Sequence, residues 1–87
     1  MEFLFKDEAE NDLNYWLQTN KSILKRIESL LKSIKQTPYK GIGRPELLKG
    51  NLSGYWSRRI NRKHRIVYTV EKDIITIYSA RDHYNDK

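Results

Sequence analysis

The sequence predicts an α+β fold, in which a short N-terminal strand and a helical hairpin pack on one face of a mainly antiparallel β-meander. Two observations carry this prediction. Apolar residues between Ile23 and Ile34 recur at intervals of three and four, the spacing of one helix face. After Pro45, short segments of alternating apolar and polar residues are separated by turn-forming residues, which is typical of hairpin-connected strands. We expect residues 1–87 to form one domain.

The first half of the chain holds the short strand and both helices. Residues 2–5 are apolar enough for a strand, and Asp7 with Glu10 three residues later matches a capping box at a helix start. Trp16 falls on the apolar face of this first helix, so we expect it in the core. The second helix should end at Thr37-Pro38.

The second half begins with a glycine-containing loop and continues as strands. The predicted strands cover residues 47–49, 55–60, 64–70 and 74–80. Alternation of side chains in a strand sorts residues onto faces. It puts Trp56, Arg58 and Ile60 together, separates His64 from Arg65, and places Ile75, Ile77, Ser79, Arg81 and His83 on one side.

Positive charge is concentrated between residues 44 and 65. This stretch holds seven basic residues and one acid, so its net charge equals the +6 of the whole chain. Interleaved with it are Tyr55, Trp56 and Tyr68, whose rings could stack on bases. A basic, aromatic stretch of this kind favours a nucleic-acid partner. The alternative is a solvated hairpin whose arginines keep an edge strand soluble.

Composition excludes several classes of site. The chain has no cysteine and only two histidines, so we expect no disulfide, no metal centre and no cofactor. No apolar run is long enough to span a bilayer, and the N-terminus lacks a signal-peptide pattern. We therefore expect a cytoplasmic protein without a membrane partner.

Three residue types suit RNA cleavage without a metal ion. A base removes the proton of the 2′-hydroxyl, an acid protonates the departing 5′-oxygen, and a cation stabilises charge on the phosphate. Glu46, His83 and Arg65 match these three roles by type. Each also has an ordinary interpretation: Glu46 as an exposed carboxylate, Arg65 as one more phosphate-positioning cation, and His83 as part of a terminal tail. We expect His64 to be structural.

The chain resembles the YoeB-type toxins of the RelE superfamily over nearly its whole length. The resemblance rests on KGNLSGYWSRRI (residues 49–60), HRIVY (64–68) and the ending ARDHY (80–84). Tyr15-Trp16 and the segment from Thr37 to Glu46 extend it. The resemblance implies a RelE-like, microbial-ribonuclease-like fold and a ribosome-dependent mRNA endonuclease, the toxin of a bacterial toxin-antitoxin pair.

The resemblance also assigns roles to residues. It implies that Glu46 is the general base, Arg65 the phosphate-stabilising cation, His83 the general acid, and Tyr84 a supporting group. Lys49 and Arg59 match basic positions near the active site. The further basic residues that would face RNA are Arg58, Arg62 and Lys63.

Partners follow from the same resemblance. It implies mRNA, the ribosome, a YefM-like antitoxin, a homodimer, and operator DNA bound only through the antitoxin complex. YoeB-type chains typically stop at the His-Tyr pair, whereas here Asn85-Asp86-Lys87 follow. Two other functions remain open at this stage: a non-catalytic RNA-binding or operator-binding module, and a toxin whose extra C-terminal residues have cost it activity.

Overall fold

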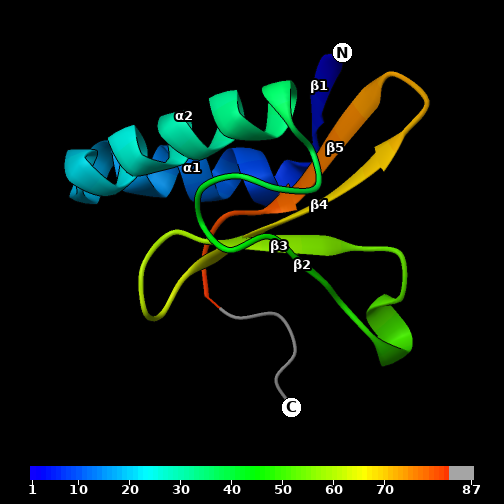
Figure 1. The fold of residues 1–87 in the computed structure, drawn as a ribbon. Coiled ribbons are helices and arrows are strands. Elements are labelled where there is room, and N and C mark those ends of the chain that lie inside the picture. Colours follow the sequence, from blue (N-terminus) through cyan, green and yellow to red (C-terminus); the bar gives the residue numbers. More distant parts are fainter. Residues whose placement is uncertain (83–87) are drawn as a thin grey trace.

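The computed structural model describes residues 1–82, which form a sheet with two helices on one side of it (Figure 1). The elements in chain order are β1 (Glu2–Phe5), α1 (Asp7–Thr19), α2 (Lys21–Gln36), β2 (Glu46–Leu47), a 3-10 turn (Gly50–Leu52), β3 (Trp56–Arg59), β4 (Arg65–Glu71) and β5 (Ile74–Ser79).

The strands form a five-stranded sheet in the order β1-β5-β4-β3-β2. Strands β2 to β5 make an antiparallel meander, and β1 joins its edge parallel to β5. The predicted α+β fold class, with its mainly antiparallel meander, is confirmed. The strand predicted at 47–49 instead begins at Glu46 and ends at Leu47, so this carboxylate sits on a sheet strand and not in the preceding loop.

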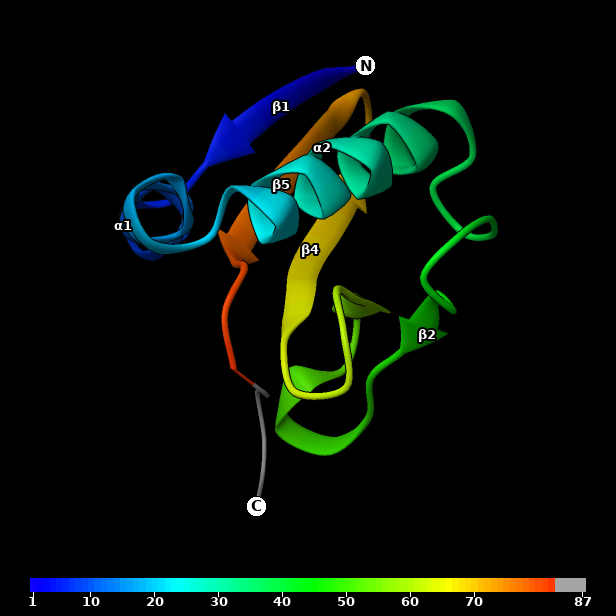
Figure 2. The same cartoon turned by 90° about the vertical axis from the view of Figure 1, so that its left-hand side faces the viewer.

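The start of the first helix differs from the prediction. α1 begins at Asp7, and Lys6 is its N-cap without any side-chain hydrogen bond, so the predicted capping box is wrong. α2 is capped by Asn20, whose side chain accepts from the N–H of Ile23. The helices also cross at an angle: Figure 2 views α1 along its axis, whereas α2 runs across the sheet. None of the helices within residues 1–82 is long and apolar enough to span a membrane.

The core lies between the helices and the sheet. Trp16 is buried there, as its place on the helix face predicts. The apolar stripe of α2 contributes three of the side chains buried there. The buried members of this core are Ala9, Trp16, Ile27, Leu30, Ile34, Ile60, Ile66, Tyr68, Ile75, Ile77 and Ala80.

A β-bulge in β5 changes which residues face away from the helices. Tyr68 pairs with Ile77, but the preceding residue Val67 pairs with Ser79, so Tyr78 is an extra residue in its strand. Ser79 therefore lies on the face of Val67, not on that of Ile77. The prediction that Ile77 and Ser79 share a face is wrong, because simple alternation holds only while the register is regular.

Candidate active site on the outer sheet face

One row of residues crosses four strands on the face away from the helices. Glu46 on β2 pairs with Ser57 on β3, Ser57 pairs with Val67 on β4, and Val67 pairs with Ser79 on β5. Partners in a sheet point to the same side, so these four side chains share one face. Ser79 Oγ is buried and has no hydrogen-bond partner among residues 1–82.

Arg65 joins this row from the next outward-facing position of β4. Its Nη1 donates to Oε1 of Glu46 at 3.3 Å and to Oγ of Ser57 at 3.2 Å. The side chain of Arg65 is 21% exposed and that of Glu46 is 62% exposed, so both can be reached from solvent. The structure thus brings together two of the residues that the sequence nominated for catalysis, and adds Ser57, which it did not.

Four of the five predicted RNA-contacting residues are exposed. Lys49 precedes the 3-10 turn and Arg59 ends β3. Arg62 and Lys63 lie in the turn between β3 and β4. Their placement is compatible with contact to a polyanion.

Arg58 is the fifth, and the prediction that it contacts RNA is wrong because its side chain is fully buried. Its Nε donates to the hydroxyl of Tyr68, and the Nη1 and Nη2 atoms donate to four further acceptors. These are Ser33 Oγ at 2.7 Å and the carbonyl oxygens of Ile42 at 3.0 Å, Thr37 at 2.7 Å and Lys40 at 2.9 Å. All five N–H donors of a guanidinium are therefore used inside the protein.

Tyr68 belongs to the same buried network and is not an RNA-stacking ring. It is fully buried, its hydroxyl donates to the carbonyl of Pro38 at 2.7 Å, and burial raises its pKa above 10.0. Together Arg58 and Tyr68 hold the loop between α2 and β2. The same loop packs so tightly that a Cβ on Gly43 would lie 2.5 Å from Leu30 Cδ2. Glu46 follows directly after this rigidly held segment.

The two other aromatic residues of the basic stretch pack against rings of neighbouring segments. Tyr55 lies 4.9 Å from the ring of Tyr78, and Trp56 lies 5.0 Å from that of Tyr39. All four are at least partly exposed, so they remain candidates for contact with bases.

The remaining nominated residues, His83 and Tyr84, lie outside the described residues, as does the extension 85–87. The chain can be followed to Asp82, whose carbonyl accepts from the backbone N–H of Arg65 at 3.2 Å. The segment that leads to His83 is therefore attached to the same residue that contacts Glu46.

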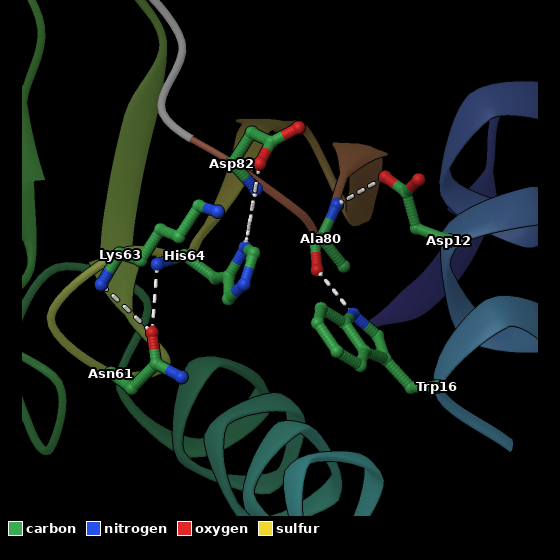
Figure 3. A network of polar contacts seen from close by, with 7 residues as sticks. All are labelled: Asp12, Trp16, Asn61, Lys63, His64, Ala80 and Asp82. Atoms are coloured by element: carbon green, nitrogen blue, oxygen red, sulfur yellow. Dashed lines mark hydrogen bonds and ion pairs between the residues drawn. The ribbon is translucent and has the colours of Figure 1, made fainter. Parts of the chain in front are cut away.

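Side chains of α1 that sequence reasoning did not select also touch this segment. Asp12 is buried and accepts from the N–H of Ala80 at 2.9 Å (Figure 3). The sequence pattern that could have identified Asp12 is an acidic residue on the buried face of an amphipathic helix, between Ala9 and Trp16. Within residues 1–82, no group of three or more histidine, aspartate and glutamate side chains is arranged to hold a metal ion.

Comparison with known proteins identifies the family. A family model described as the YoeB-like toxin of bacterial type II toxin-antitoxin systems matches residues 5–84. Toxin YoeB of Escherichia coli K12 is 46% identical over 84 residues, which cover 97% of this chain and 100% of that protein.

Two solved structures from Staphylococcus aureus are similar throughout. The YoeB dimer has a TM-score of 0.90 at 47% identity, covering 97% of this chain and 98% of the other. A heterotetrameric YoeB-YefM toxin-antitoxin complex has a TM-score of 0.87 at 48% identity, covering 94% and 95%. The resemblance seen in the sequence is confirmed, and the chain belongs to the YoeB-like toxins of bacterial type II toxin-antitoxin systems.

Proposed function

We propose that this chain is an endoribonuclease that cleaves mRNA in the decoding site of the ribosome and so stops translation. One observation carries the proposal. Arg65 contacts the exposed carboxylate of Glu46 through its side chain and binds the carbonyl of Asp82 through its backbone N–H. A base, a cation and the residue before a histidine thus meet at one position of β4.

The reaction uses the nucleophile that RNA itself carries. Glu46 removes the proton from the 2′-hydroxyl, and the oxygen forms a bond to the adjacent phosphorus. The bond from phosphorus to the 5′-oxygen breaks as His83 protonates that oxygen. The products are a 2′,3′-cyclic phosphate, which water can open to a 3′-phosphate, and a 5′-hydroxyl. Side chains handle each proton, so this mechanism requires no metal ion, and Tyr84 supports the substrate or the acid.

Arg65 is equipped to stabilise the phosphate during this reaction. Of its guanidinium nitrogens, only Nη1 makes hydrogen bonds within residues 1–82, which leaves donors on Nε and Nη2. A guanidinium with two adjacent N–H groups matches two phosphate oxygens. Charge that grows on the phosphate in the transition state would therefore meet a fixed cation.

The exposure of the carboxylate and of the cations near it supports dependence on the ribosome. The side chain of Glu46 is 62% exposed, and exposed basic residues lie on the neighbouring segments. We infer that Lys49, Arg59, Arg62 and Lys63 bind ribosomal RNA and the message, and that the ribosome holds the message against the sheet. Cytoplasmic action follows from this role.

Partners are proposed on the strength of the relatives. The S. aureus YoeB forms a heterotetramer with YefM, and it also forms a dimer. We propose that a YefM-like antitoxin silences this chain, that the free toxin dimerises, and that operator DNA is bound only through the antitoxin complex. Light scattering with and without a YefM-like protein, and operator binding by each species, test these three statements.

The cleavage proposal is tested by primer extension on an mRNA stalled at a defined codon in purified ribosomes. We expect wild-type protein to cut only in the decoding-site codon and not in the same mRNA without ribosomes. Glu46→Gln and His83→Ala should each lower the rate by about 10²-fold or more. Arg62→Ala, an exposed turn cation, should lose far less, because it contributes only screened attraction.

Other outcomes would favour the alternatives. If Glu46→Gln and His83→Ala cleave as fast as wild type, the assigned mechanism is wrong. If wild-type protein binds ribosomes but leaves the message intact, the chain is an RNA-binding module or an inactive toxin. Deleting residues 85–87 separates these two, because only the inactive toxin should regain cleavage.

A further inference from the structure

Two side chains of α1 hold both peptide groups of Ala80, the first residue after β5 (Figure 3). The indole Nε1 of Trp16 donates to the carbonyl oxygen of Ala80 at 2.8 Å, and the Ala80 N–H donates to Oδ2 of Asp12 at 2.9 Å. Asp12 and Trp16 are four residues apart, so they lie on one face of the helix. The chain leaving the sheet is therefore fixed against α1.

A third side chain holds the chain two residues later. The Asp82 N–H donates to Nδ1 of His64 at 2.7 Å, and the Asp82 carbonyl accepts from the Arg65 N–H at 3.2 Å. Asp82 has a φ of +64°, in the left-handed region, which aspartate tolerates better than most non-glycine residues. Both peptide groups of the residue before His83 are thus bound.

Two of the three side chains, Trp16 and His64, contact each other, and Asp12 and Trp16 are shielded from water. The rings of Trp16 and His64 meet edge to face with centroids 4.7 Å apart. Asp12 is 7% exposed and Trp16 is 5% exposed. A carboxylate in such a place is costly unless it is bound, and the group that it binds is a peptide N–H of the C-terminal segment. Between the two clamped residues, the guanidinium of Arg81 lies over the ring of Tyr15, 3.8 Å from its centroid.

We propose that Asp12, Trp16 and His64, here named the C-terminal clamp, are positioning residues that place His83 for proton transfer. This inference rests on the proposed function, in which His83 is the general acid. The clamp binds Ala80 and Asp82, which follow β5, and Asp82 is also bound by the backbone N–H of Arg65 on β4. A misplaced catalytic group costs rate rather than binding, because it matters only when the proton moves.

The chemistry of the clamp defines the variants that test it. Trp16→Phe keeps an aromatic ring but removes the donor to Ala80. His64→Leu removes the acceptor for the Asp82 N–H, whereas His64→Asn restores an acceptor oxygen near the place of Nδ1. Ile34→Val in α2 is the matched control, because it loosens the core and leaves the hydrogen bonds to Ala80 and Asp82 in place.

The experiment measures kcat and KM separately for cleavage of mRNA on programmed ribosomes. Trp16→Phe and His64→Leu should each lower kcat by roughly 10- to 100-fold while KM stays within about twofold. His64→Asn should recover much of the loss, and Ile34→Val should retain the kcat of wild type. Circular dichroism at the assay temperature confirms that each variant is folded.

The outcomes distinguish the clamp from the function on which it rests. If His83→Ala abolishes cleavage but Trp16→Phe and His64→Leu keep the wild-type kcat, the clamp proposal is wrong and the proposed function stands. If His64→Asn is as slow as His64→Leu, or Ile34→Val is as slow as both, His64 contributes only to folding. If His83→Ala cleaves normally, both proposals fall.

Discussion

Arg58 on β3 and Arg65 on β4 point to opposite faces of one sheet, and their guanidinium groups are used differently. Arg58 is fully buried on the helix side and donates to five acceptors from α2, the following loop and β4. Arg65 is partly exposed on the outer side, and among residues 1–82 its guanidinium binds only through Nη1, to Glu46 and Ser57.

The comparison shows that the acceptors around an arginine decide what it can do. A guanidinium whose donors are all satisfied by buried groups can bind no phosphate, and it holds the surrounding chain instead. A guanidinium with donors left over beside an exposed carboxylate can bind a substrate. The two regions should therefore respond in opposite ways to mutation: one in stability, the other in activity.

The largest loss of stability is expected for Arg58→Met. This change removes the donor of the Ile42 carbonyl, and a buried group left unsatisfied costs about 1–3 kcal/mol. The carbonyls of Thr37 and Lys40 each lose one of two donors, because the Lys40 N–H and the Thr37 hydroxyl still bind them. We expect the free energy of unfolding, measured by urea denaturation, to fall by about 3 kcal/mol or more. The exposed neighbour of Arg58 gives the control, since Arg59→Met should change the free energy of unfolding by less than about 0.5 kcal/mol. Equal losses in both variants would show that the buried network adds nothing.

A smaller loss of stability is expected for Gly43→Ala, in the loop between α2 and β2. Gly43 has a φ of +84°, and a Cβ there would lie 2.5 Å from Leu30 Cδ2 and 3.2 Å from Arg58 Cβ. Gly54 has a φ of +93° with no heavy atom within 4 Å of such a Cβ. Both alanine variants carry backbone strain, but only Gly43→Ala also overpacks. The free energy of unfolding of Gly43→Ala should be lower than that of Gly54→Ala by about 1–3 kcal/mol in thermal and urea denaturation. The reverse order would mean that the loop shifts to accommodate the added Cβ without cost.

On the outer face, Arg65→Gln should cost less than about 1 kcal/mol of stability, because an exposed ion pair contributes little. The same variant should cleave mRNA on ribosomes at least about 10²-fold more slowly. Denaturation and primer extension on one preparation measure both quantities. A stability loss as large as that of Arg58→Met would remove the distinction between the two faces.

The smallest effect, and one that depends on pH, is expected for Asp12→Asn. Burial raises the pKa of Asp12 above 3.8, so the folded state binds the proton more tightly than the unfolded state does. The contribution of this carboxyl to stability is therefore complete below pH 3.8 and is lost as the pH rises through its folded pKa. Asparagine does not titrate and can still accept from the Ala80 N–H.

Relative to wild type, the Asp12→Asn variant should accordingly gain stability as the pH is raised from below 3.8 to neutral. Urea denaturation over this pH series checks the prediction, with Glu28→Gln, an exposed acid of α2, as the charge-matched control. A difference between Asp12→Asn and wild type that is the same at every pH would contradict it.

Much of the fold follows from patterns within short segments. The apolar stripe of α2 and the alternation in β3 and β4 predict these elements to within one or two residues at most ends. The burial of Arg58 could also have been predicted, because the alternation places it beside Ile60 and Trp56 on the apolar face. The concentration of charge around it favoured an RNA-binding role instead, and this misled the interpretation.

Other features depend on partners far away in the sequence. The bulge at Tyr78 exists only in the pairing of β4 with β5, so alternation within β5 could not reveal that Ser79 faces outward. The hydrogen bond between Asp12 and Ala80 joins residues 68 positions apart. No local pattern reports such contacts.

By itself, the sequence determined the α+β class, the family and the concentration of charge, and it suggested the residue types proposed for the site, because periodicity and motifs are local properties of a chain. The tertiary structure decided which arginine is buried, which carboxylate meets Arg65, and which side chains hold the segment before His83. These depend on which donors and acceptors face each other after folding, and buried polar groups are retained only where such partners converge.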